Sequence, residues 1–346
     1  MLLTRDVLEN LRVERLAGGF PRSPLQRNGL GESDAELVRI PGTGLLLAIT
    51  TDAIVEEIDT GLYQDPYLIG WMTIIACCSD LAAVGADPIG VLLNETLLAE
   101  SDADFECRLQ QGVRDACEAC GVHLLGGDTN LSDRLHLGAT GVGTVPEGEA
   151  MRRTGCRPGD HLYVTGTLGL GNAFAFDVLT GGAGGIRPGY QPVSRMPEGR
   201  LLRRFASACM DTSDGLVATL DELMRRSGFG LQLHSDSQEL LHPVASALAH
   251  EAGIPGWVFL AGPHGEFELV YSVPPARLSS FLTAATVTGL TALELGTARA
   301  EPGLQLSNED GGAWLDTAGM RNLAGETTLD IHRIVARHLA LAYPKE

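Results

Sequence analysis

Residues 211–216 read Asp-Thr-Ser-Asp-Gly-Leu, and the spacing of the apolar residues that follow predicts a helix over 214–227. Asp and Ser are common at helix N termini because their side chains accept hydrogen bonds from the first free N–H groups. Two carboxylates and a hydroxyl before one glycine are more oxygen ligands than a cap requires, and divalent cations such as Mg²⁺ prefer oxygen ligands. The stretch therefore predicts a divalent-metal site beside the start of this helix.

Other aspartates occupy comparable positions along the chain. Asp52 ends a short apolar run over 44–51, Asp128 follows Gly126-Gly127, and Asp34 lies in a polar loop, whereas Asp80 lies inside a helix pattern and needs a partner there. Each of these residues taken alone is an ordinary turn or cap residue, but the set points to a shared metal site.

Positive charge for a phosphate site has few sources in this chain. No segment matches the GxxxxGK[ST] phosphate loop, and the sequence contains one lysine, Lys345. Arginines such as Arg152 and Arg153, helix N termini and carboxylate-held Mg²⁺ remain as partners for a nucleotide phosphate. The Gly18-Gly19 pair predicts a flexible loop that closes over phosphates, or only a turn.

Composition limits the classes of function. The formal net charge is −19, which argues against nucleic-acid and anionic-membrane partners and favours cations and small molecules. No uninterrupted apolar run reaches 18 residues and the first ten residues have no signal-peptide pattern, so we expect a cytoplasmic protein without a membrane span. The seven cysteines, including the Cys117/Cys120 CxxC inside a helix pattern, are expected to be reduced structural thiols.

The chain is long enough for two domains, with a boundary expected near residue 150. Apolar periodicity predicts an α/β (α+β) protein in which strands and helices alternate. The expected strands are 44–51, 89–95, 122–125, 134–144, 161–165, 230–234, 266–273 and 292–297, and the expected helices are 66–86, 102–120, 171–181, 199–208, 214–227, 275–284 and 328–342. The Gly/Pro-rich stretch 181–198 is expected to be a mobile loop.

Two further residues have alternative roles. His264, between Pro263 and Gly265, is either a functional base in a second-substrate pocket or a solvated loop residue, and the second is the commoner case. Trp257, expected before a strand, either stacks on a ligand ring or packs in the core.

In their order along the chain, the motifs resemble those of the superfamily of aminoimidazole ribonucleotide (AIR) synthase, thiamine-monophosphate kinase, selenophosphate synthetase and the hydrogenase maturation protein HypE. Residues 79–86, Ser-Asp-Leu-Ala-Ala-Val-Gly-Ala, resemble the thiamine-monophosphate kinase pattern almost letter for letter. The other resembling segments are 33–37, 50–56, 126–129, 153–160, 164–166 and 211–216. The resemblance extends from about residue 15 to about residue 275.

This resemblance implies a PurM-like fold. Residues 1–150 would form an ATP- and Mg²⁺-binding dimerisation domain whose strands pair with those of a second copy in a β-barrel, and residues 151–346 a C-terminal α/β domain. A homodimer would bind ATP near the subunit junction, with a small-molecule acceptor as second substrate. The implied metal ligands are Asp34, Asp52, Asp80, Asp128, Asp211 and Asp214; the implied catalytic residues are Asp128, Asp211 and Asp214; and the implied nucleotide-binding residues are Thr51, Asp52, Gly127, Thr129, Arg153 and Ser213.

The chain departs from the resembling pattern at several positions. Ser33 replaces the first aspartate of the pattern, and Asp59 replaces a histidine in the acceptor region. Residues 264–269, His-Gly-Glu-Phe-Glu-Leu, differ from Gly-Glu-Asp-Tyr-Glu-Leu, and 316–327 lack the closing aromatic segment that helps to hold the thiamine ring. These changes leave the acceptor open.

The resemblance favours an ATP- and Mg²⁺-dependent kinase that acts on a small, phosphorylated or heterocyclic acceptor. Two alternatives stay open at this point: an AIR-synthase-like cyclo-ligase that activates an amide or carbonyl oxygen, and a catalytically silent nucleotide-binding protein. A HypE-like role is disfavoured because residues 342–346, Ala-Tyr-Pro-Lys-Glu, contain no cysteine.

Overall fold

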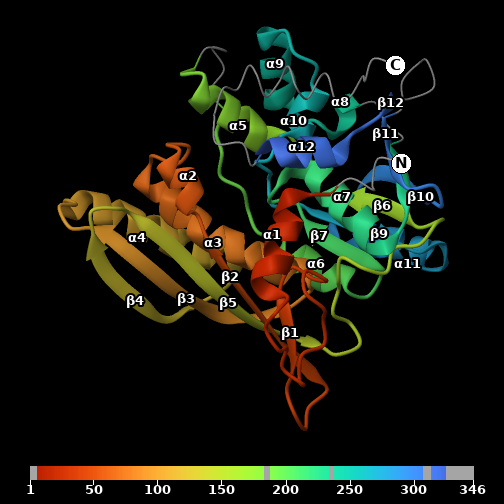
Figure 1. The fold of residues 1–346 in the computed structure, drawn as a ribbon, viewed down its shortest axis with the longest axis horizontal. Coiled ribbons are helices and arrows are strands. Elements are labelled where there is room, and N and C mark those ends of the chain that lie inside the picture. The colour runs from red at the N-terminus through yellow and green to blue at the C-terminus, as the bar shows by residue number, and fades with distance from the viewer. Residues whose placement is uncertain (1–5, 183–187, 234–236, 307–312, 325–346) are drawn as a thin grey trace.

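The computed structural model describes residues 6–182, 188–233, 237–306 and 313–324, which form two β-sheets with helices packed around them (Figure 1). All strands of the first sheet come from residues up to and including Pro146, and all strands of the second come from residues after Asp160. A helix of the first half, α3, contacts both parts of the molecule.

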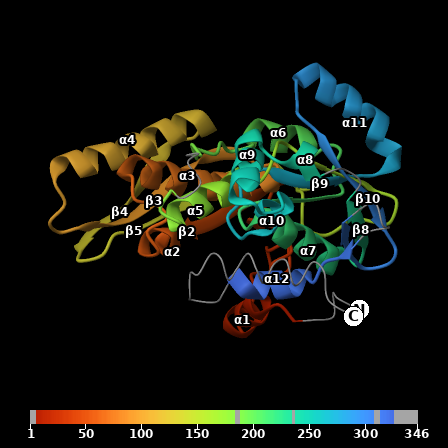
Figure 2. The same cartoon turned by 90° about the horizontal axis from the view of Figure 1, so that it is seen from above.

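The first sheet has the order β1-β2-β5-β3-β4, and only the β3–β4 pair is parallel. Its strands are β1 (Glu36–Arg39), β2 (Leu45–Ala53), β3 (Asp87–Leu98), β4 (Leu124–Ser132) and β5 (His136–Pro146). Figures 1 and 2 show α3 (Pro66–Ala83) and α4 (Ala103–Cys120) on the same side of this sheet. The short helix α2 (Val55–Asp59) follows β2.

The opposite face of the first sheet, called the open face here, is uncovered by any described element (Figure 1). Leu45 and Leu92 on this face are 37% and 41% exposed. The edge strand β4 adds Leu124, Leu125 and Leu131, which are 49%, 50% and 67% exposed. An exposed apolar surface next to an unpaired strand edge is typical of a protein-protein contact.

Helix α3 begins because Asp65 accepts a hydrogen bond from the Tyr67 N–H and Pro66 provides a preset first residue. It is apolar on all sides and is the one helix among the described residues that is long and apolar enough to cross a membrane, but 72% of it is buried within the protein. Burial on all sides is typical of a core helix. Helices α3 and α4 can approach closely because Gly112 has no side chain. A Cβ atom at this position would lie 2.0 Å from the Tyr67 carbonyl oxygen.

The second sheet has the order β12-β11-β8-β10-β6-β9-β7, and only β11–β8 is parallel. Its strands are β6 (His161–Val164), β7 (Ala208–Asp211), β8 (Gly230–Leu233), β9 (Leu269–Val273), β10 (Leu293–Arg299), β11 (Gly303–Leu306) and β12 (Ala313–Trp314). The helices of this part are α5 (Leu170–Leu179), α6 (Met196–Leu202), α7 (Gly215–Ser227), α8 (Ser237–Leu240), α9 (Pro243–Ala252), α10 (Trp257–Ala261), α11 (Pro275–Thr288) and α12 (Thr317–Ala324). The N-terminal helix α1 (Leu8–Ala17) lies beside α12 and α7 (Figures 1 and 2).

Most expected elements are present, and three expectations were wrong. The helix expected over 199–208 ends at Leu202, and 208–211 form strand β7. All four β7 residues are buried, so their apolar run has no periodicity that separates strand from helix. The strand expected from 266 begins at Leu269, and Trp257 starts helix α10 rather than preceding a strand. The helix expected over 328–342 lies outside the described residues.

Candidate functional site

Four aspartates from four separate elements meet at the junction of the two sheets. Asp34 precedes β1, Asp52 is on β2, Asp80 is on α3 and Asp211 ends β7. Carboxylate oxygens of Asp34, Asp80 and Asp211 all lie within 4.8 Å of one another. The side chain of Asp52 is within hydrogen-bonding distance of Asp80. These four residues are called the acidic cluster below.

Packing of α3 against the second half brings the cluster together. A side chain on Gly199 of α6 would lie 2.1 Å from the Ala82 carbonyl oxygen, so the two backbones touch at the end of α3. The Ser79 hydroxyl on α3 donates a 2.6 Å hydrogen bond to Asp211 Oδ2 on β7. Asp80 therefore faces Asp211 although 131 positions separate them in the sequence.

Hydroxyl groups and one arginine hold the carboxylates in place. The Ser213 hydroxyl donates to Asp211 Oδ1 at 3.0 Å, and the Thr50 hydroxyl donates to Asp80 Oδ2. Arg153 Nη2 donates to Asp34 Oδ1 at 3.0 Å, and the Asp34 side chain is 1% exposed. Asp34 Oδ2 and Asp52 Oδ2 are buried, and no donor from the described residues reaches either oxygen.

Burial and mutual repulsion raise the pKa values of the cluster. Burial and the charges of Asp52, Asp211 and Asp34 raise the pKa of Asp80 well above its usual range. Burial, followed by the charge of Asp34, raises the pKa of Asp211 to about 7. Burial also raises the pKa of Asp52. A divalent cation would relieve this repulsion, and two orphaned carboxylate oxygens are suitable ligands for it.

Asp214 lies at the margin of the cluster, at the N terminus of α7. Burial and the nearby charge of Glu9 raise its pKa to about 6. Asp214 and Glu9 line a cavity of about 60 Å³ between α1, α7 and α12. The side chain of Asp214 makes no cap hydrogen bond to α7.

The other predicted residues lie away from the cluster in the single chain. Register pairs Asp128 with Asn94, Gly138 and Ala53 across the sheet, one position from the row that contains Asp52. Because side chains alternate along strands, Asp128 is on the open face and Asp52 faces the helices. Thr51 also lies on the open face, where the Thr140 hydroxyl donates to its hydroxyl at 3.2 Å. Gly127 and Thr129 are on the exposed edge strand, and the Thr129 hydroxyl donates to Glu95.

The positions that depart from the resembling pattern have structural partners. Ser33 is buried, accepts from Asn28 and donates to the Ala35 carbonyl oxygen at 2.8 Å, so it stabilises its own loop. Asp59 pairs with Arg134 at 3.2 Å on the surface. Arg195 binds Glu268, which also accepts from Thr165.

His264 is buried, which contradicts the expected solvated loop position. It forms an aromatic cluster with Tyr63, Phe174 and Tyr190, with ring centroids 5.0 Å apart for Tyr190 and His264 and 4.9 Å for Phe174 and Tyr190. Burial lowers the pKa of His264 to about 4, so its ring is neutral at pH 7. Trp257 is buried in the core of the second half, as expected for a packing residue.

Two glutamates next to the aromatic cluster have no counterpart among the predicted residues. Burial and the charges of Glu56, Asp214 and Asp52 raise the pKa of Glu57, and the charge of Glu57 in turn acts on Tyr63. Glu57 is therefore close enough for its charge to interact with both Asp52 of the acidic cluster and Tyr63 of the aromatic cluster. Glu266 is buried, accepts from the Gly171 N–H at 2.8 Å, and has a pKa raised to about 8 by burial. In the sequence Glu57 looks like a surface residue of a short helix, so no local signal identified it.

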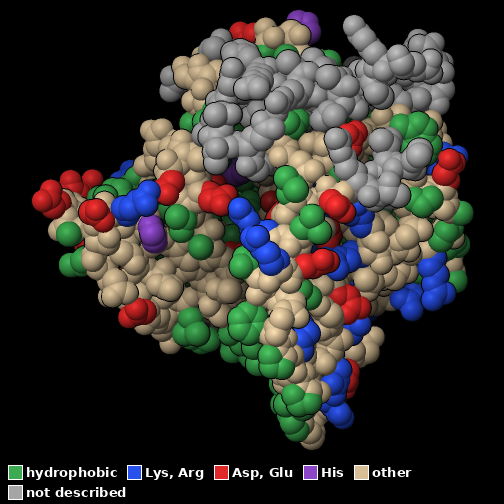
Figure 3. Space-filling view, viewed as in Figure 1, with side chains coloured by type: hydrophobic (Ala, Val, Ile, Leu, Met, Phe, Trp, Pro, Cys, Tyr) green, Lys and Arg blue, Asp and Glu red, His purple; other side chains and the backbone are tan. Residues whose placement is uncertain are grey.

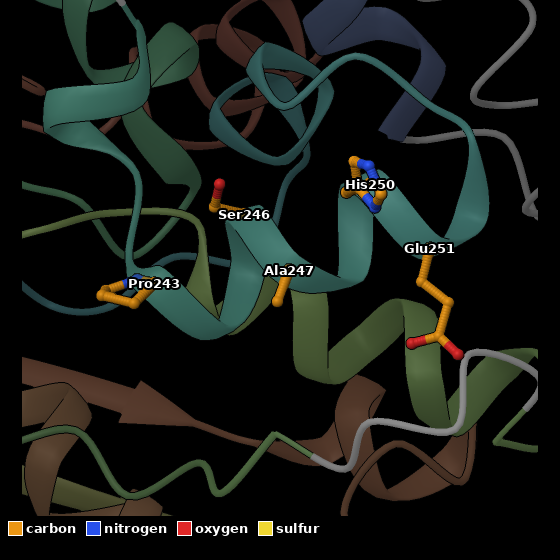
Figure 4. A pocket seen from close by; sticks show the side chains of 5 residues that line it. All are labelled: Pro243, Ser246, Ala247, His250 and Glu251. Carbon is orange, nitrogen blue, oxygen red and sulfur yellow. The ribbon is translucent and has the colours of Figure 1, made fainter.

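An open depression of about 880 Å³ lies elsewhere, along α9 (Figure 4). Its lining residues, Pro243, Ser246, Ala247, His250 and Glu251, all come from one helix. None belongs to the acidic or aromatic cluster, and we assign no function to this surface.

Comparison with known proteins gives consistent matches. The model of the AIR synthase related protein N-terminal domain matches residues 32–145. The thiamine-monophosphate kinase of Methanospirillum hungatei is 30% identical over 289 residues, which cover 82% of this chain and 91% of that protein. The corresponding kinase of Halobacterium salinarum is 32% identical over 233 residues, covering 67% and 78%.

Solved structures share the fold. The structure of AaThiL complexed with AMPPCP and TMP has a TM-score of 0.68 at 23% identity and covers 88% of this chain and 94% of that chain. The structure of E. coli HypE, a hydrogenase maturation protein, has a TM-score of 0.67 at 22% identity, covering 83% and 88%. At these identities the structures establish the PurM-like α/β fold and leave the reaction to other evidence.

Proposed function

The chain belongs to the thiamine-monophosphate kinase family of AIR synthase-related proteins and is an ATP-dependent kinase, and on that premise we propose that Mg²⁺-bound ATP phosphorylates a small phosphorylated heterocycle at the acidic cluster. In this reaction an acceptor oxygen forms a bond to the γ-phosphorus of ATP, the bond to the β,γ-bridging oxygen breaks, and ADP leaves. The kinase activity of the relatives favours phosphoryl transfer over the two alternatives, a cyclo-ligase reaction and a catalytically silent nucleotide-binding protein.

The observation that carries the proposal is the acidic cluster with its two orphaned buried oxygens, Asp34 Oδ2 and Asp52 Oδ2. Mg²⁺ held by Asp34, Asp80 and Asp211, with Asp52 beside them, would neutralise charge that develops on the transferred phosphoryl group. The pattern of oxygen ligands without a histidine or thiolate fits Mg²⁺ better than zinc.

The surrounding residues position these ligands. Ser79 and Ser213 orient the two oxygens of Asp211, and Thr50 orients Asp80. Arg153 fixes Asp34 and offsets part of the negative charge. These contacts set the carboxylates before any substrate arrives, which lowers the reorganisation needed for catalysis. Asp214 is proposed to take part in catalysis beside the acidic cluster.

The acceptor is proposed to bind between Glu57 and the aromatic cluster. Rings such as Tyr63 and Tyr190 suit an aromatic heterocycle, and a carboxylate beside them suits a heterocycle with positive charge. The name of the relatives and the TMP bound in AaThiL support thiamine monophosphate as the first acceptor to test. Asp59 and residues 264–269 are expected to change affinity for that acceptor, because they alter the charge and shape of the region.

We further propose that two copies of the chain associate through the open face and the β4 edge. This face carries exposed leucines together with Thr51 and Asp128. In a homodimer these two residues would face the partner, which would explain why Asp128 does not reach the acidic cluster of its own chain. The domain boundary near residue 150 and a cytoplasmic location stay predictions.

The experiment that tests the kinase proposal incubates the protein with ATP, Mg²⁺ and single acceptors, with thiamine monophosphate first and other phosphorylated heterocycles after it. ADP and a phosphorylated acceptor are expected in equal amounts by chromatography and mass spectrometry. ADP with a cyclised or dehydrated product would instead indicate ligase chemistry. Absence of turnover on every acceptor, with ATP still bound, would favour the silent protein.

A further inference from the structure

The acidic cluster leaves a shortage of positive charge for a triphosphate, and the nearest arginines are already engaged. Arg153 is bonded to Asp34. Arg321 of α12 contacts Asp221 at 3.0 Å and Glu222 at 2.9 Å. A nucleotide with four negative charges therefore needs further cations, because paired arginines contribute little net charge.

Helix α1 is held next to the cluster by polar contacts at its first turn. The Leu8 N–H donates to Asn322 Oδ1 at 2.8 Å, and Asn10 Nδ2 donates to Glu222 Oε2 at 2.9 Å. Glu9 lines the same small cavity as Asp214. None of the α1 residues is buried, so the helix lies on the surface at the edge of the site and is not packed into a core.

Arg12 and Arg15 of α1 are exposed and have no hydrogen-bond or ion-pair partner among the described residues. Arg12 follows Glu9 by three positions, so the two lie on one flank of the helix, and Arg15 continues that flank by another three. Figure 3 shows basic side chains beside a hollow at the junction of the two halves, where α1 lies in Figure 1.

We propose that Arg12 and Arg15 bind the triphosphate of the nucleotide and supply the cationic charge that lysine supplies in phosphate loops. This inference rests on the proposed function, because it requires ATP at the acidic cluster. Arginine is suited to the task since its planar group donates several hydrogen bonds to phosphate oxygens and stays charged at any physiological pH.

The test measures binding of AMPPCP, an ATP analogue, in the presence of Mg²⁺ by isothermal titration, so that no acceptor is needed. The Arg12→Ala/Arg15→Ala double variant is expected to bind AMPPCP at least tenfold more weakly than the wild type, and Arg12→Lys/Arg15→Lys to recover part of the loss. Arg200→Ala is the matched control, since Arg200 is an exposed arginine of α6 that makes no hydrogen bond or ion pair with the described residues, and the affinity of this variant should be unchanged. Circular dichroism and the melting temperature should match in all variants, because the substituted side chains are exposed.

Each outcome separates the two proposals. Wild-type binding with equal affinity in the double variant would overturn the role of Arg12 and Arg15 and leave the kinase proposal intact. Failure of the wild type to bind AMPPCP would overturn both. A tenfold loss in the double variant, with unchanged affinity in Arg200→Ala, supports the assignment.

Discussion

Asp52 Oδ2 is buried and accepts no hydrogen bond from any described residue. It lies beside Asp80, whose pKa is raised by burial and by the charges of the neighbouring aspartates. Such an arrangement costs stability in the free protein and is retained where a ligand offsets the cost. The sequence predicted Asp34, Asp52, Asp80 and Asp211 because each lies in a recognisable motif. It did not reveal Glu57, which comes near Asp52 and Asp214 only through the fold.

Asp52→Asn is expected to lower Mg²⁺-dependent ATP turnover by at least about 100-fold, because it removes one negative oxygen from the proposed metal site. The same change should leave the fold intact and keep or raise the melting temperature without Mg²⁺, since it removes a repelling charge. Turnover and thermal unfolding check both parts. Asp104→Asn, at an exposed position of α4, serves as control and should change neither; unchanged turnover in Asp52→Asn would remove the metal assignment.

At the scale of elements, the strong periodic segments were predictable and the short ones were not. Helices α3 and α4 have N-caps at Asp65 and Asp102 and continuous apolar patterns, so their bounds follow from local sequence. The bounds of strand β7 and helix α1 do not follow from local sequence. Strand β7 consists of four buried residues, and helix α1 has no buried residue. The position of α1 depends on contacts with residues more than 200 positions away, such as Glu222, which no local pattern contains.

Glu222 links three helices, because it accepts from Asn10 of α1, Arg226 of α7 and Arg321 of α12. Burial opposes its charge, but these hydrogen bonds outweigh burial and lower its pKa to about 2. A carboxyl with a lowered folded-state pKa adds stability above its unfolded value of 4.5, and this contribution is lost as pH falls toward 2. The shift corresponds to about 3 kcal/mol at neutral pH.

Glu222→Gln is therefore expected to be less stable than the wild type at pH 7, and the difference in free energy of unfolding should shrink as pH falls from 5 toward 2. Urea unfolding at a series of pH values measures this difference. Glu118→Gln, at an exposed position of α4, should show no such pH dependence. A constant difference between pH 7 and pH 3 for Glu222→Gln would contradict the assigned contacts.

At the scale of the whole molecule, the two sheets create one site because α3 of the first half packs against α6 and β7 of the second. The resemblance predicted this two-part architecture from ordered motifs, while in the single chain no described element covers the open face, on which Asp128 lies. A second copy would cover that face.

Leu92→Asp is expected to convert a dimer into a monomer, because a carboxylate on the open face would be buried without a partner at the contact. Light scattering coupled to size exclusion should give twice the chain mass of 36.6 kDa for the wild type and that mass for the variant. Leu282→Asp on α11 is the matched control, since Leu282 is 45% exposed away from the open face, and should remain a dimer. A monomeric wild type would contradict the proposed association.

The central claim is that carboxylate-held Mg²⁺ serves phosphoryl transfer at the acidic cluster. The most direct measurement follows the labelled γ-phosphoryl group of ATP into thiamine monophosphate as the Mg²⁺ concentration is varied. We predict no transfer in excess EDTA, saturable recovery when Mg²⁺ is restored, and no recovery in Asp52→Asn. Transfer that continues undiminished in EDTA, or that Asp52→Asn leaves unchanged, would contradict the account.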